Sequence, residues 1–137
     1  MSIPCPIEAF SHVKKESLTP EMKQVVQRGA EFLLIHRIFK GDHNKFEIVN
    51  KSWLKPSFPF FYGYNILREL DFLTGLGYVK DERLNDAVQI LLQKRQKVGS
   101  WVLESSPTGR LHVNIESKRR SSKWITLIVL RVLKRQA

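Results

Sequence analysis

The sequence predicts an all-α fold made of two tandem α/α hairpins, a partial toroid-like repeat with about four main helices and long loops. Four segments carry apolar residues at helical spacings of three, four and seven. An internal repeat links them, because Ala30 aligns with Ala87 at an offset of 57 residues and Tyr64 aligns with Trp124 at an offset of 60. In such repeats each hairpin buries an apolar face against the next one.

The first hairpin is expected at about residues 19–77, after an N-terminal arm at residues 1–18 that carries a short helix near 7–15. Its first helix begins at Thr19-Pro20-Glu21, an N-cap followed by proline and an acid, and should run to about Lys40. A long polar loop follows. The second helix should then run from about Phe60 to Leu76.

The second hairpin is expected at about residues 81–136, so that the repeat domain spans 19–137. Its first helix should begin at Asp81, which is placed as an N-cap, and continue to about residue 98. Gly99 should leave that helix in a left-handed conformation, and Trp101 should fold back over the helix end. The last helix should span 122–135 and lie centrally, because it is apolar nearly all round.

Residues 102–116, which connect these two helices, contain a turn around Pro107. Alternating apolar residues give this connection weak strand character, although it is expected to be mainly loop.

The spacing of Gln93, Gly99 and Trp101 is Q-x5-G-x-W. It resembles the QW motif of the triterpene cyclases, within the prenyltransferase and squalene-cyclase α/α repeat superfamily. Stretches at 28–40, 58–77, 81–104 and 122–135 also resemble an uncharacterised bacterial branch of that superfamily. The resemblance implies a structural role for all three residues, with the glutamine capping a helix end and the tryptophan stacking on it. A closed toroid would need about twice as many hairpins.

Composition limits the possible classes of protein. The chain has 137 residues, enough for one domain, and 23 Lys and Arg against 13 Asp and Glu, a formal charge of +10. Cys5 is the only cysteine, which excludes an internal disulfide and fits a reducing compartment. We find neither an N-terminal apolar signal segment nor an apolar run long enough to cross a membrane, so a cytoplasmic location is the default expectation.

The sequence predicts neither a catalytic site nor a metal or cofactor site. A cyclase that protonates an alkene would need a clustered D-x-D-D motif, and the prenyltransferases use a zinc site of Asp, Cys and His; neither arrangement occurs. Asp71 stands alone on its helix, with Arg68 as the expected ion-pair partner. Glu69 is explained as a solvated acid.

Aromatic residues supply the candidate ligand-binding surface, at Trp53, Tyr62, Tyr64 and Trp124, with Arg68 beside them. Binding of an apolar or isoprenoid-like ligand, or of a protein partner, is the predicted function of this non-catalytic protein. The alternative is that these aromatics only pack the hairpins. Two other hypotheses remain, a remnant of a terpene cyclase or prenyltransferase-like enzyme, and a basic module that binds nucleic acid without sequence preference. Self-association could cover the open repeat face.

Overall fold

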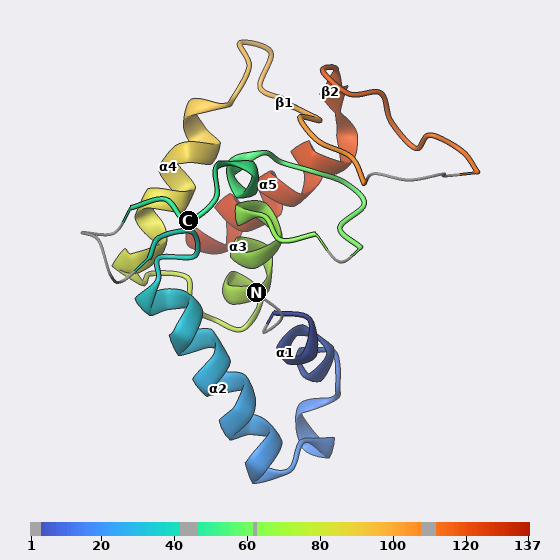
Figure 1. Ribbon diagram of the computed structural model, residues 1–137. Helices are drawn as coiled ribbons and strands as arrows, with labels where there is room; N and C mark the ends of the chain where they lie inside the picture. Colours follow the sequence, from blue (N-terminus) through green and yellow to red (C-terminus); the bar gives the residue numbers. More distant parts are fainter. Residues whose placement is uncertain (1–3, 42–46, 62, 108–111) are drawn as a thin grey trace.

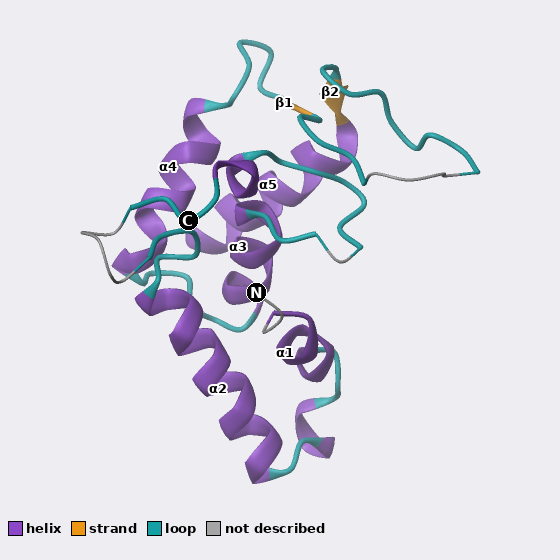
Figure 2. Ribbon diagram, in the orientation of Figure 1, coloured by secondary structure: helices purple, strands orange, loops and turns teal. Residues whose placement is uncertain are grey.

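The protein is a mostly helical small domain in the computed structural model, which describes residues 4–41, 47–61, 63–107 and 112–137. The described part contains five α-helices and one small antiparallel sheet (Figures 1 and 2). In chain order the elements are α1 (Pro4–Ser11), α2 (Pro20–Ile35), α3 (Ile66–Gly75), α4 (Asn85–Gln93), β1 (Trp101–Val102), β2 (Ser121–Ser122) and α5 (Lys123–Gln136). The helical class is therefore confirmed, and the two-stranded sheet is an addition to the all-α prediction.

Helices α3 and α5 make the most extensive contact between elements and form the centre of the molecule (Figure 1). Leu67, Leu70 and Leu73 of α3 are fully buried, as are Val129 and Val132 of α5. Helix α4 packs against α3, and α1 packs along α2. Helix α5 thus lies centrally, as predicted, but its apolar surface is not covered all round, because a stripe on its outer face stays exposed, comprising Trp124, Leu127 and Leu130.

Helix starts follow side-chain caps that can be located in the sequence. Thr19 Oγ1 accepts a hydrogen bond from Met22 N at 3.2 Å, as predicted. The side chain of Ser122 caps α5 in the same way, at 3.0 Å from Ile125 N. Asp81 caps a short 3₁₀ turn, Glu82–Leu84, that leads directly into α4.

The second predicted helix begins later than expected. Helix α3 starts at Ile66 rather than near Phe60, because the Asn65 side chain accepts the amide of Arg68 at 3.1 Å and the preceding residues form an irregular loop.

Two helices end in the same hydrogen-bond pattern, a Schellman motif. At the end of α3, Tyr78 N reaches Leu73 O while Gly77 adopts a φ of +104°. At the end of α2, Ile38 N reaches Leu33 O while Arg37 adopts a φ of +45°. The expected end of α2 near Lys40 is therefore wrong by about one turn, since a non-glycine residue takes the left-handed position that usually marks a helix stop.

The helix before Trp101 is also shorter than predicted, because α4 ends at Gln93 rather than near residue 98. Gly99 does have a positive φ of +82°, but it lies in a turn closed by Gln96 N to Ser100 O at 2.9 Å. The indole of Trp101 folds back and is 1% exposed, and its Nε1 donates to Leu91 O at 2.6 Å. Leu91 O lies in the last turn of α4, where no following turn supplies the usual helical donor, and it accepts both the indole and the amide of Lys94.

Gln93 does not take the role that the QW spacing implies, since its side chain is exposed. Gln96 serves the turn instead, because its Oε1 accepts hydrogen bonds from Ser100 Oγ at 2.8 Å and from Ser121 Oγ at 2.7 Å. The glutamine that secures the tryptophan turn is therefore three residues later than the spacing suggested.

Candidate functional site

A hollow lined by aromatic and hydroxyl side chains lies where the loop before α3 meets the segment after β1. The amides of Glu104 and Ser105 both donate to Pro56 O, at 3.1 and 3.2 Å, and Ser57 forms a parallel bridge with Ser105. Asn65 Nδ2 donates to Ser57 Oγ at 2.9 Å, which ties this wall to the start of α3. Two segments far apart in sequence are thus held side by side.

We call this hollow the aromatic groove. Its volume is about 540 Å³, within the usual range for small-molecule sites. Its apolar lining consists of Pro59, Phe60, Phe61 and Pro107. The rest of the lining is polar apart from Gly63. It consists of the hydroxyl-bearing residues Ser52, Ser57, Tyr64, Ser105 and Ser106 and the cation Lys55. The groove therefore combines an aromatic bed with a polar, positively charged rim.

Phe61 is the most conspicuous member of the groove. Its side chain is 55% exposed, and its backbone has a φ of +36°, a conformation that non-glycine residues rarely adopt. The surrounding structure must supply the energy that holds such a conformation, which commonly occurs at ligand sites. Part of that support is visible, because Phe61 O accepts a hydrogen bond from Arg68 Nη1 at 2.8 Å.

Arg68 organises the loop that carries the groove. Its Nη1 also donates to Gly63 O at 3.1 Å, and its guanidinium lies 5.9 Å from the ring centre of Phe60. On its other side, Nε and Nη2 donate to Glu8 Oε2 at 2.9 and 2.6 Å. The side chain is 10% exposed. Arg68 thus connects α1 to the groove loop and acts as a positioning residue.

The predicted ligand-binding residues fall into three groups. Trp53 and Tyr64 pack together with ring centres 4.5 Å apart, and Tyr64 lines the groove. Trp124 lies outside the groove and stacks on Phe58 at 5.2 Å, with the ring planes inclined by 8°. Tyr62 lies outside the described residues. Of the predicted residues within the described ranges, Tyr64 lines the groove, whereas Trp53, Arg68 and Trp124 do not.

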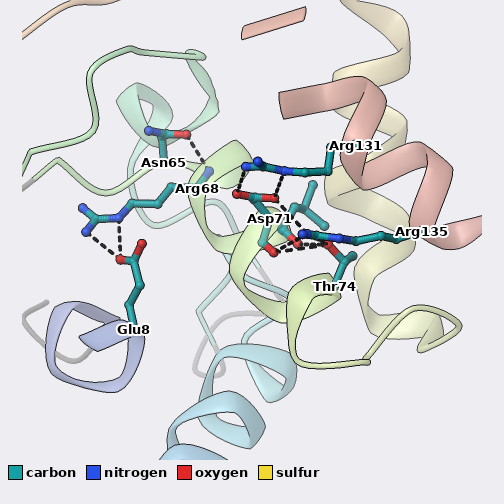
Figure 3. Close-up of polar contacts among 8 residues, drawn as sticks. Glu8, Asn65, Arg68, Asp71, Thr74, Arg131 and Arg135 are labelled. Atoms are coloured by element: carbon teal, nitrogen blue, oxygen red, sulfur yellow. Dashed lines mark hydrogen bonds and ion pairs between the residues drawn. The ribbon is translucent and has the colours of Figure 1, made fainter. Parts of the chain in front are cut away.

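Asp71 forms its ion pairs with a different helix from the one expected. Figure 3 shows its carboxylate between two arginines of α5, with Arg131 Nη2 at 2.5 Å and Arg135 Nη1 at 2.9 Å. The predicted partner Arg68 reaches Glu8 instead, since it points toward α1. A hollow of about 280 Å³ borders Asp71, but carboxylates and guanidinium groups already neutralise one another there.

Glu69 is not the solvated acid that the sequence suggested. It is 1% exposed, and its Oε1 has no hydrogen-bond partner among the described residues. Burial raises the pKa of Glu69 to about 8; the positive charge of Arg68 opposes this shift and the negative charge of Glu8 adds to it. Burial, together with the charge of Glu69, also raises the pKa of Tyr64. Glu69 is therefore a protonated, neutral group at neutral pH.

This protonation predicts a pH-dependent stability. The pKa of Glu69 is raised from 4.5 to about 8 on folding, so its stabilising effect is complete below about pH 4.5 and is lost as the pH rises toward 8. The contribution to the free energy of unfolding should fall by about 1.4 kcal/mol per pH unit in that window. Urea denaturation of wild type and Glu69→Gln between about pH 5 and 8 should show a steeper decline for wild type. Parallel curves for the two proteins would contradict the assignment.

Several groove residues had no signal in the sequence. Lys55, Ser57, Ser105 and Ser106 are ordinary polar residues of loops, and only the bridge between residues 57 and 105 brings them together. The sequence did not indicate that Glu8 would pair with Arg68, because the two residues are 60 positions apart along the chain. Within the described residues, no group of three or more His, Cys, Asp and Glu side chains could hold a metal ion.

None of the helices in the described ranges combines the length and the apolar character needed to cross a bilayer. Comparisons of the chain with protein-family models, with curated proteins and with solved structures find no match.

Proposed function

We propose that this protein is a non-catalytic helical repeat module that binds an apolar, isoprenoid-like ligand in the aromatic groove. The observation that carries the proposal is Phe61, an exposed aromatic side chain held in a strained backbone conformation over a hollow of ligand size.

The composition of the groove favours an amphipathic ligand. Phe60, Phe61 and the two prolines offer apolar surface to a hydrocarbon chain. Lys55 and the serine hydroxyls can donate hydrogen bonds to an alcohol or to a diphosphate head group. An isoprenoid alcohol or its diphosphate combines both parts, which is the chemical class we propose.

The repeat architecture is part of the same proposal. We assign α2 with α3 and α4 with α5 as two tandem α/α hairpins by sequence order, although the main helix contacts are α3 with α5, α1 with α2 and α3 with α4 rather than those within each pair. Support comes from the contact between α3 and α5, the second helix of each pair, and from the offsets of 57 and 60 residues that relate the two pairs in sequence. A search for structural superposition of the two helix pairs tests this assignment directly.

Binding can be tested with farnesol and farnesyl diphosphate by isothermal titration calorimetry. Phe61→Ala should weaken both ligands by about tenfold or more, because it removes an aromatic contact while keeping a non-glycine residue at the positive φ. Lys55→Gln should weaken the diphosphate several-fold and leave the alcohol unchanged. Val98→Ala is the matched control, since Val98 is 82% exposed and outside the groove. Equal affinities for wild type and Phe61→Ala, or no binding of either probe, would refute the proposal.

A further inference from the structure

A second surface, independent of the aromatic groove, lies around β1 and β2. Ser121 Oγ donates to Gln96 Oε1 at 2.7 Å, and Arg119 N and Leu103 O are joined at 2.8 Å. These bonds hold the turn at residues 95–100 and the segment at 112–122 together beside the start of α5. Figure 1 places this region at the end of the molecule opposite the start of α2. We call it the basic end.

Cations gather at the basic end without neutralising partners. Five are exposed and form no ion pair with any residue that the structure describes: Lys97, Lys118, Arg119, Arg120 and Lys123. Other described cations differ in this respect, since Lys94 and Arg131 are paired with carboxylates, while Lys23 and Arg28 on α2 are exposed and form no ion pair with a described residue. Two acids lie nearby among the described residues: Glu104 pairs with Lys94, and Glu116 accepts hydrogen bonds from Ser122 Oγ and Lys123 N, which fixes the start of α5.

Exposed apolar side chains lie near these cations along the chain, in the segment before α5 and on α5 itself. On the outer face of α5, Trp124 is 39% exposed, Leu127 54% and Leu130 47%. Their spacing of three places them along one side of the helix. Val113 and Ile115 are also exposed in the segment that leads to α5. The surface is therefore both apolar and strongly basic.

We propose that the basic end binds the surface of an anionic lipid bilayer. Phosphate head groups would neutralise the unpaired cations, while Trp124 and Leu127 would enter the boundary between head groups and acyl chains. A second copy of the chain fits poorly because it would place like charges against one another. Nucleic acid would neutralise the cations but would leave the leucines without a favourable contact.

Vesicle co-sedimentation tests this proposal on the full chain. Wild type should bind vesicles of phosphatidylcholine with about one-third phosphatidylglycerol at least tenfold more tightly than phosphatidylcholine alone, and about 0.5 M NaCl should weaken that binding. Lys118→Gln with Arg120→Gln should lower the partition coefficient by about tenfold or more. Leu127→Asn should lower it several-fold even at low salt.

Matched controls lie on α2, at the other end of the molecule. Lys23→Gln and Val25→Asn remove an exposed cation and an exposed apolar side chain there, and both should bind vesicles as wild type does. Absence of vesicle binding, or equal effects of control and basic-end variants, would overturn the proposal. So would tight binding of a random DNA duplex that Leu127→Asn leaves unchanged, in the absence of vesicle binding. Sedimentation velocity that shows a dimer lost in Leu127→Asn would overturn it in favour of self-association.

Discussion

Replacing Trp101 with alanine should lower the free energy of unfolding by about 3–5 kcal/mol. The indole is 1% exposed, and its Nε1 donates to Leu91 O at the end of α4. The change leaves a large cavity between α4 and α5 and removes one hydrogen bond, although Leu91 O keeps the amide of Lys94 as a donor at 3.2 Å, so lost packing dominates. Urea denaturation followed by circular dichroism measures the loss, and the fluorescence of the remaining tryptophans reports whether the fold persists.

Comparison with the two nearby glutamines separates the observed contact from the one implied by the Q-x5-G-x-W spacing. Gln93→Ala should change stability by less than about 0.5 kcal/mol because its side chain is exposed. Gln96→Ala should cost about 1 kcal/mol, since two serine hydroxyls lose their acceptor. Trp124→Ala is the aromatic control and should cost less than Trp101→Ala. Strong coupling between Trp101 and Gln93 in a double-mutant cycle would contradict this assignment and restore the QW interpretation.

Replacing Arg68 with methionine should cost about 3 kcal/mol, the second large effect. Methionine retains much of the apolar volume but leaves Glu8 without its cation and removes the donor to Phe61 O and Gly63 O. The value lies at the lower end for a broken buried pair because Glu8 is 25% exposed and can be solvated. Since the groove loop loses its anchor, affinity for farnesol should fall in the same variant.

The surface pair on the other side of α3 provides the contrast for this experiment. Arg131→Met breaks an ion pair to Asp71, yet Arg131 is 46% exposed and Arg135 still contacts the same carboxylate. Its cost should be below about 1 kcal/mol. Equal losses of stability for the two arginine variants would show that burial of the Glu8–Arg68 pair does not matter, and would remove the reason for assigning Arg68 a positioning role.

Local signals in the chain located three N-caps and two of its sharp turns, but not the starts of α1 and α3. Thr19, Asp81 and Ser122 each cap the segment that follows, because a short polar side chain can satisfy a free amide within three residues. Gly77 and Gly99 adopt positive φ values, as their lack of a Cβ permits. The aromatic composition of residues 58–64 also pointed to the region where the groove lies.

Contacts between residues far apart in the sequence determined where α2 ends and which side chains of α3 are buried. Arg37 takes a left-handed conformation at the end of α2 because the following residue, Ile38, becomes buried in the core, and that burial depends on the rest of the fold. Glu69 looked solvated because it stands beside Arg68 and near Asp71 in a polar stretch, but helix α3 is enclosed by α5 and the groove loop. Its burial, and hence its raised pKa, is a property of packing.

The sequence by itself determined the helical class, the caps at Thr19, Asp81 and Ser122, and the basic character of the chain, since these depend on residue type and on spacing within one or two turns. Only the tertiary structure decided which carboxylate each arginine meets, that Gln96 rather than Gln93 serves the Trp101 turn, and which loops enclose a groove. Those outcomes depend on side chains that lie tens of residues apart along the chain, and a periodic pattern carries no information about which of them will meet.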